Sequence, residues 1–239
     1  NSDGVVLGLS GGIDSAVTLS LSVAALGSDR VTGLIMPYEH TESVDLAKHH
    51  AEQLNVNTET VSIKQIVESF KSSSSLFAEK LSEGNLHSRI RMSILYGAGF
   101  SSNRLVVGTS NKSELLIGYW TKWGDGGTDF LPIGDLYKSQ VYSLGEELGV
   151  PSGILSRKPT AELWEGQTDE EEFGFTYLEL DQVLFNLERF DSVSQISEKT
   201  GISLEIIAKI KKLIQSSIHK RVFPPVSYTH LRAHETLLD

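Results

Sequence analysis

A short polar stretch near the start of the chain, Ser10-Gly11-Gly12-Ile13-Asp14-Ser15, combines the groups that bind a polyphosphate. Its glycines let the backbone turn tightly and approach a ligand, and the helix expected to follow offers unpaired N–H groups and a partial positive charge. The serine hydroxyls add further donors. Asp14 would repel a phosphate unless a divalent cation bridges the two. The stretch therefore predicts a pyrophosphate site that includes Mg²⁺.

The same residues also fit an ordinary helix cap, in which Ser10 or Asp14 caps the helix and the glycines only turn the chain. A Walker loop is excluded, because GxxxxGK[ST] is absent and no lysine follows the glycines. The third glycine of a dinucleotide fingerprint is also missing. The position of the stretch between an apolar strand-like run and a helical pattern favours the anion site over the cap.

The elements that would position this loop alternate between strand and helix. Strand-like runs occupy residues 5–10, 31–36, 58–63 and 105–108, and helical patterns occupy 14–26, 43–54 and 85–100. This alternation predicts an α/β protein with a Rossmann-like, doubly wound parallel sheet and right-handed crossovers. Residues 72–75 join two helices, and residues 120–130 and 156–173 are predicted as loops. A helical C-terminal part follows at 176–219, with an apolar 3.6-residue period in Leu204, Ile207, Ile210 and Ile214.

The composition bounds the class of protein. Apolar residues make up 39% and charged residues 22% of the 239 residues, which predicts one soluble globular domain. No run approaches the roughly 18–20 apolar residues of a membrane span, and no signal peptide is expected. The net charge of −10 disfavours nucleic acid as a partner. The lack of cysteine excludes disulfides and a cysteine nucleophile, and fits the cytoplasm.

SGGxDS is the signature loop of the ATP pyrophosphatases, and later stretches resemble the NAD synthetases among them. The segment 85–92, NLHSRIRM, resembles the family's NxxARxRM, with Ser88 in place of an alanine, a change we expect to be harmless. GTSNKSE at 108–114, TKWGDGGTD at 121–129, LYKSQ at 136–140, KPTAEL at 158–163 and HKR at 219–221 follow in the family's order. The resemblance predicts a single domain over residues 1–225. Residues 226–239 match nothing expected and are interpreted as a tail of unknown origin, either a disordered or a non-native extension.

The resemblance implies an adenine nucleotide alpha hydrolase-like fold and an AMP-forming ligase. Such an enzyme amidates deamido-NAD to NAD with ATP and ammonia through an acyl-adenylate, and is a homodimer. The implied ATP contacts are Gly8, Leu9, Ser10, Gly11, Gly12, Ile13, Asp14, Ser15, Met36, Thr109, Lys138 and Thr160. The implied deamido-NAD contacts are Arg89, Lys122, Asp129, His219 and Lys220, and the implied Mg²⁺ ligands are Asp14 and Glu114.

Three residues are assigned to catalysis by the same resemblance: Asp14, Lys138 and Asp129, of which Asp129 would orient the nicotinate end or the ammonium. Several assignments keep an alternative. Met36 borders the adenine or packs in the core, Glu114 binds the metal or lies on a solvated helix, and Lys122 binds substrate or is a surface charge. Residues 156–173 are a candidate lid over ATP, because a reactive adenylate must be shielded from water.

Free ammonia is the expected direct nitrogen donor, unless a separate subunit supplies it. Glutamine-dependent family members carry an extra amidase domain with a catalytic cysteine, and this chain has no cysteine. Two alternative functions remain open at this point. One is another ATP pyrophosphatase, either GMP synthetase-like, against which TKWGDGGTD and HKR argue, or tRNA-modifying, against which the acidic charge and the lack of cysteine argue. The other is a catalytically silent nucleotide-binding regulator. Such a protein would not be expected to keep together the residues Asp14, Glu114, Lys122, Lys138 and Thr160.

Overall fold

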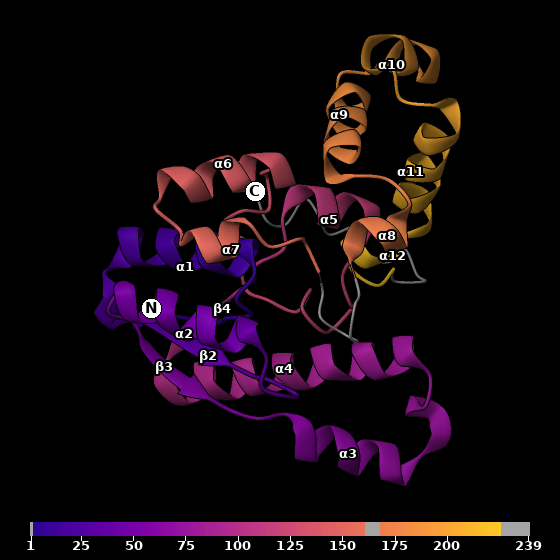
Figure 1. Ribbon diagram of the computed structural model, residues 1–239. Coiled ribbons are helices and arrows are strands. Elements are labelled where there is room, and N and C mark those ends of the chain that lie inside the picture. Colours follow the sequence, from indigo (N-terminus) through magenta and orange to yellow (C-terminus); the bar gives the residue numbers. More distant parts are fainter. Residues whose placement is uncertain (1, 161–167, 226–239) are drawn as a thin grey trace, which may run out of the picture.

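The computed structural model describes residues 2–160 and 168–225 (Figure 1). The end of KPTAEL, much of the candidate lid, and the tail at 226–239 lie outside these residues. A sheet of four parallel strands organises the N-terminal part: β1 (Gly4–Gly8), β2 (Val31–Ile35), β3 (Asn57–Thr60) and β4 (Arg104–Val107), in the order β3-β2-β1-β4. The third strand is shorter than predicted and ends at Thr60. The predicted parallel sheet is confirmed.

Helices cover both faces of the sheet because its central strands are apolar on both sides. α1 (Ile13–Leu26) and α2 (Glu42–Gln53) pack on one face, where Leu19 and Ala51 meet Val5 and Leu7. α3 (Lys64–Ser73) and α4 (Lys80–Ser102) lie on the opposite face, as Figure 1 shows. The sequence analysis did not assign α3. The linker at 72–75 does join α3 to α4, by way of the 3₁₀ turn η2 (Ser75–Phe77).

Strand β1 is the switch point of the sheet. Val6 pairs with Thr32 of β2 on one side and with Val106 of β4 on the other, so the chain crosses over in opposite directions from β1. Ligands bind outside the carboxyl ends of the strands at such a point. The SGGIDS loop leaves β1 at this end, between β1 and α1. The fold therefore places the predicted anion loop where this class of sheet binds ligands.

The C-terminal part is helical, as predicted. It contains α9 (Tyr177–Glu188), α10 (Val193–Thr200), α11 (Leu204–Ser216) and α12 (Ile218–Arg221). Between β4 and α9 lie α5 (Lys112–Ile117), α6 (Lys138–Glu147), α7 (Ser152–Leu155) and α8 (Asp169–Phe173), and the 3₁₀ turn η1 (Ser28–Arg30) precedes β2. Figure 1 shows α9 to α11 standing together beside the sheet. Their own core includes Leu180, Ile196, Ile207 and Ile210. The predicted period is only partly right, because Leu204 is 55% exposed.

The predicted loop at 156–173 is wrong at its end, where residues 169–173 form α8. Thr168 accepts a hydrogen bond from the Glu171 N–H, and acidic residues fill the first turn. A helix begins there because anionic side chains near the helix N-terminus interact favourably with its dipole. The predicted loop at 120–130 is confirmed, with a single bridge from Phe130 to Val107 of β4. No helix in the described part of the chain is long and apolar enough to cross a membrane.

One buried histidine makes the stability of this fold sensitive to pH. His87 lies in α4 with its ring stacked on Tyr38, the ring centroids being 4.7 Å apart. Neither ring nitrogen has a hydrogen-bond partner among the described residues. Burial and the nearby charge of Arg91 lower the pKa of His87 to about 4, although Glu83 opposes the shift. His87 is therefore neutral in the folded protein at neutral pH.

We expect the folded protein to lose stability as the pH falls from about 6.5 towards about 4. Over this range an unfolded histidine binds a proton and the folded His87 does not, so protonation favours unfolding and costs about 2 kcal/mol at pH 5. Urea unfolding at pH 8 and pH 5 should show a loss that is about 2 kcal/mol smaller in His87→Phe than in wild type. The exposed His49 provides the control, and His49→Gln should keep the full loss. Equal losses in His87→Phe and wild type would contradict this assignment.

Candidate active site

The SGGIDS loop has the shape of an anion cradle. Ser10 Oγ lies 3.1 Å from Ser15 Oγ and accepts a hydrogen bond from the Gly12 N–H at 3.2 Å, while Ser15 Oγ donates to the Gly12 carbonyl at 3.0 Å. Gly12 is the N-cap residue of α1, and no side chain caps this helix. The alternative interpretation, with Ser10 or Asp14 as a cap, is therefore wrong. The N-terminus of α1 remains available for an anion.

Gly11 is the glycine of this loop at which an added side chain would cause more strain than at Gly12. Its φ is +79°, and an added Cβ would lie 2.1 Å from the carbonyl oxygen of Ser43. We expect Gly11→Ala to lower the free energy of unfolding by about 2–4 kcal/mol, because strain and a backbone clash add together, and to weaken ATP binding. Gly149→Ala is the control, since Gly149 also has a positive φ, of +69°, but open space around it. Urea unfolding should show the larger loss at Gly11, and equal losses would contradict the clash.

A buried lysine joins the loop to two carboxylates. Lys138, the first residue of α6, donates to Asp14 Oδ2 at 2.5 Å and to Glu114 Oε1 at 3.1 Å, and its side chain is 3% exposed. Asn111 donates to the other oxygen of Asp14 at 2.8 Å. Asn111 and Glu114 also form a reciprocal capping box at the start of α5, which fixes the position of the Glu114 carboxylate.

The electrostatics of this cluster follow from its burial. Burial raises the pKa of Glu114 to about 7, against the opposing charge of Lys138. For Lys138, burial disfavours the ammonium, but the carboxylates of Asp14 and Glu114 outweigh it and raise the pKa above its usual value. Lys138 is therefore a permanent cation. One lysine faces two carboxylates here, so the cluster has no excess positive charge by itself, and a bound divalent cation would supply the charge that favours a polyphosphate.

The two carboxylates fit a Mg²⁺ ion that arrives with phosphates. Asp14 and Glu114 already share one cation, the Lys138 ammonium, and present the oxygen donors that Mg²⁺ takes. No group of three or more His, Asp or Glu side chains within the described ranges could hold a metal by itself. Mg²⁺ is usually bound by one or two carboxylates together with water and substrate phosphates.

A second cluster gathers four residues that the sequence analysis assigned to the dinucleotide. Arg89 Nη2 donates to the Lys122 carbonyl at 3.4 Å, and Lys122 Nζ donates to the His219 carbonyl at 2.7 Å. Lys220 Nζ donates to the carbonyls of Gly118 and Trp120 at 2.6 and 2.5 Å. α4, the 121–129 loop and α12 therefore meet at one place.

Asp129 lies apart from these contacts, at the edge of β4. Its Oδ2 accepts from the Val106 N–H at 2.7 Å and its Oδ1 accepts from the Tyr96 hydroxyl at 3.2 Å. Met36 is buried, and its methyl group would lie 3.3 Å from a Cβ at Gly8, which supports core packing. Thr109 and Thr160 are half-buried, at the end of β4 and in the KPT segment.

Residues 1–224 match the family model described as NAD synthase. The chain belongs to the NAD synthase family. It is 47% identical over 93% of its length to the NH(3)-dependent NAD(+) synthetase of Thermococcus kodakarensis, of which it covers 88%. Among solved structures, it resembles an NMN synthetase from Francisella tularensis (TM-score 0.84, 38% identity, 95% of this chain and 90% of that one). It also resembles an NH3-dependent NAD synthetase from Campylobacter jejuni (TM-score 0.80, 35% identity, 95% and 91%).

This membership decides between the enzyme families considered above. It favours the NAD synthase family over GMP synthetase-like and tRNA-modifying enzymes. The GTSN segment connects β4 to α5. It therefore places the Asn111 cap and the Glu114 carboxylate beyond the carboxyl end of β4, where this class of sheet binds ligands.

Two further residues, Asp169 and Tyr177, lie beside the cluster of Lys138, Asp14 and Glu114, and the sequence analysis did not assign them to the site. Asp169 is 3% exposed and accepts hydrogen bonds from the hydroxyls of Tyr119 at 3.1 Å and Tyr177 at 3.0 Å. Tyr177 also reaches Glu114 at 3.4 Å. Asp169 N–H donates to the Pro159 carbonyl at 3.1 Å, which ties α8 to the KPT segment. An acidic run such as TDEE signals a helix start but does not indicate that one member is buried.

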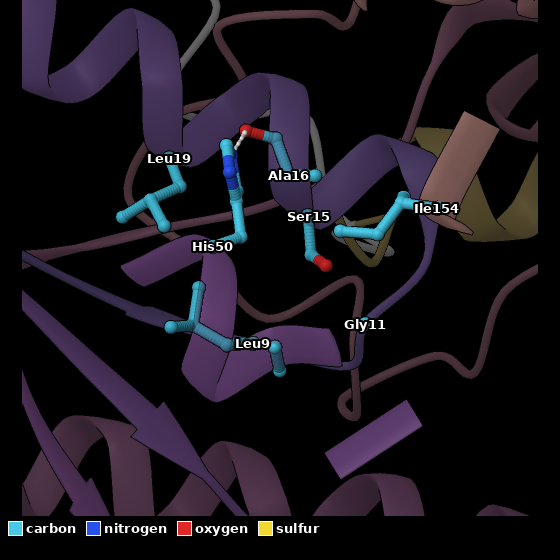
Figure 2. A pocket seen from close by; sticks show the side chains of 8 residues that line it. Leu9, Gly11, Ser15, Ala16, Leu19, His50 and Ile154 are labelled. Atoms are coloured by element: carbon cyan, nitrogen blue, oxygen red, sulfur yellow. Dashed lines mark hydrogen bonds between the residues drawn. The ribbon is translucent and has the colours of Figure 1, made fainter. Parts of the chain in front are cut away.

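Behind the anion loop of this family member lies a small cavity, shown in Figure 2. Its volume is about 10 Å³, and Gly11, Ser15 and His50 contribute to its lining. The space suffices for about one water molecule and not for a nucleotide. His50 Nε2 lies 3.2 Å from the Ala16 carbonyl and 3.1 Å from Ser20 Oγ. The cavity therefore belongs to the packing between α1 and α2.

Proposed function

We propose that this chain is an ammonia-dependent ligase that converts deamido-NAD to NAD with ATP, releasing AMP and pyrophosphate. One observation carries the proposal: a single short helix joins the two clusters. α5 presents Glu114 to the Lys138 cluster in its first turn, and its C-cap Gly118 accepts a hydrogen bond from Lys220. Four residues of helix span about 6 Å. This short separation between the two clusters suits a reaction between the α-phosphate of ATP at one cluster and the carboxylate of deamido-NAD at the other.

The chemistry needs two anions to meet. A carboxylate oxygen of deamido-NAD attacks the α-phosphate of ATP, and the bond to the β-phosphate oxygen breaks to release pyrophosphate. Ammonia then attacks the acyl carbon of the adenylate, AMP leaves with the former carboxylate oxygen, and the nitrogen loses a proton to give the amide. Lys138 and the N–H groups of the SGGIDS loop would hold the departing pyrophosphate by electrostatic stabilisation. Mg²⁺, when bound at Asp14 and Glu114, would neutralise further phosphate charge.

The dinucleotide end of the site is proposed on the second cluster. Arg89, Lys122 and Lys220 supply cationic groups that suit the phosphates of deamido-NAD, and His219 lies on the same short helix as Lys220. The Asp129 carboxylate accepts hydrogen bonds from Val106 and Tyr96. A role for it in orienting the nicotinate end or the ammonium stays a proposal, which full activity of Asp129→Asn would remove.

The test is a stoichiometric assay of the purified protein. Given ATP, Mg²⁺, deamido-NAD and ammonium, the protein should form NAD and AMP in equal amounts. Replacing ammonium with glutamine should abolish NAD formation. A folded protein that binds ATP and forms no AMP with any substrate would favour the silent regulator.

A second candidate substrate comes from the likeness to an NMN synthetase. The same amidation on nicotinate mononucleotide would give NMN, and the reacting carboxylate is chemically identical. The two substrates differ only in the adenylate half of the dinucleotide. Comparing kcat/KM for deamido-NAD and nicotinate mononucleotide decides between them. We expect deamido-NAD to be the better substrate, because relatives named NAD(+) synthetases are 47% identical to this chain, whereas the NMN synthetase is 38% identical.

We also propose that the protein is a homodimer. Large apolar side chains are exposed near one edge of the sheet, where Phe100 at the end of α4 is 92% exposed and Leu105 of β4 and Phe130 are each 42% exposed. A second copy of this chain would remove such surface from water. Light scattering after gel filtration should give twice the mass of 26.2 kDa, and the monomer mass would contradict the proposal.

A further inference from the structure

The serine that departs from the family's NxxARxRM pattern makes a reciprocal contact. Ser88 Oγ donates to Asp125 Oδ1 at 2.6 Å and accepts from the Asp125 N–H at 2.8 Å. Asp125 Oδ1 also accepts from the Thr121 N–H at 2.9 Å. An alanine at position 88 could make neither of the hydroxyl's bonds. Ser88 and Asp125 together form what we name the clasp, between α4 and the 121–129 loop.

The clasp holds the part of the loop that carries Lys122. Gly124 fits against Ser88 so closely that an added Cβ would lie 2.5 Å from Ser88 Oγ. Trp123 has a φ of +60°, which is uncommon for a bulky side chain and costs energy that surrounding contacts must supply. Lys122, just before it, donates to the His219 carbonyl. The backbone from 121 to 125 is therefore fixed on both sides of Lys122.

The clasp also lies beside Arg89. Arg89 follows Ser88 directly in α4 and donates to the Lys122 carbonyl at 3.4 Å. Thr121 Oγ1 adds a bond to Asn85 Oδ1 at 2.8 Å, one turn earlier on the same helix. α4 thus sets the position of Arg89 and, through the clasp, the position of Lys122. The hydrogen bonds of the clasp described here involve neither Lys138 nor its two carboxylate partners, so the two parts of the site are separable by mutation.

We propose that Ser88, through Asp125, is a positioning residue that tunes the affinity for the dinucleotide substrate. The inference rests on the proposed function, because it assigns Arg89 and Lys122 to deamido-NAD. Ser88 is buried, and we assign it no direct contact with either substrate. It acts by holding Lys122 at the spacing from Arg89 that the phosphates of deamido-NAD require.

Ser88→Ala tests this proposal. The KM for deamido-NAD should rise about threefold to tenfold, while the KM for ATP and kcat stay within about twofold. This rise corresponds to about 0.7–1.4 kcal/mol, which is the net contribution of one hydrogen bond. Hydrogen exchange of the free protein should be faster at amides 121–127 in the variant, a readout that requires no catalysis.

Two further variants serve as controls. Ser93→Ala removes a hydroxyl from an exposed position of the same helix, where Ser93 Oγ bonds only to the Arg89 carbonyl of its own helix, and should behave as wild type. Asp125→Asn keeps the Oδ1 acceptor and the N–H, so it should retain the slow exchange at 121–127 and most of the affinity.

The outcomes separate this inference from the proposed function. A wild-type protein that forms no NAD overturns the proposed function. Faster exchange in Ser88→Ala with an unchanged KM for deamido-NAD overturns the inference alone. An equal rise in both KM values, with a fall in kcat, would also overturn it, because Ser88 would then support the whole domain.

Discussion

Replacing Lys138 with methionine should lower kcat/KM for ATP by about 10²–10³-fold. Lys138 is the buried cation that faces both Asp14 and Glu114, and removing one group that stabilises developing charge in a water-excluded site has an effect of this size. Methionine keeps most of the volume of the side chain, so the packing of its aliphatic part is preserved. Initial rates of AMP formation at varied ATP measure the loss.

Stability must be measured with the same variant, because the substitution leaves two carboxylates without their shared cation. Breaking a buried pair costs about 3–5 kcal/mol at most. Glu114 relieves part of this cost, because its pKa is already raised to about 7 and it can take up a proton. We therefore expect Lys138→Met to fold with a lowered melting temperature. Lys199→Met, which removes an exposed ion pair with Asp191, is the matched control and should keep full activity.

A loss of less than about tenfold in Lys138→Met would mean that Lys138 only neutralises Asp14 and Glu114. In that case the SGGIDS loop would hold the pyrophosphate without the lysine.

Local patterns predicted much of the fold correctly. Apolar runs ending in glycine predicted β1 and the loop after it, because a central parallel strand must be apolar on both faces. The predicted strand at 58–63 was too long, since β3 lies at the sheet edge and its residues are exposed, which leaves no hydrophobic pattern to read. α3 was missed although Ile66, Val67 and Phe70 have the spacing of an amphipathic helix. Its pattern is confined to ten residues that end in the serine run.

The sequence assigned residues to the candidate site but did not predict the contacts between them. Asp14, Glu114 and Lys138 come from three separate motifs, and the bridge that Lys138 makes between the two carboxylates depends on packing between α1, α5 and α6. Asp169 could not be found at all, because it is buried against Tyr119, which follows α5, and Tyr177, which begins α9, and both are distant from it or unmarked in the sequence pattern. Ser88 was expected to be a harmless replacement for alanine. Its partner, Asp125, is distant in the sequence, so only the fold reveals their contact.

Asp14→Asn should be as damaging as the loss of Lys138, although asparagine has nearly the same shape as aspartate. The Asp14 carboxylate accepts from Asn111 Nδ2 at one oxygen and from Lys138 Nζ at the other. An amide has a single acceptor oxygen, so in either orientation its NH₂ group faces one of these donors. The variant loses a hydrogen bond and half of the negative charge that would hold Mg²⁺ against the phosphates of ATP.

We expect Asp14→Asn to lower the rate of AMP formation by about 10²–10³-fold and to require a higher Mg²⁺ concentration for half-maximal rate. The second effect is the more diagnostic, because a metal ligand sets the metal dependence whereas a purely structural residue changes only the maximum rate. Asp135→Asn is the matched control. Asp135 is 96% exposed and pairs with Lys112, away from the cluster, so its Mg²⁺ dependence should match that of wild type. If Asp14→Asn kept the wild-type Mg²⁺ dependence, the metal would have to be held by Glu114 and the phosphates alone, and the role of Asp14 would be to anchor Lys138 at the end of the anion loop.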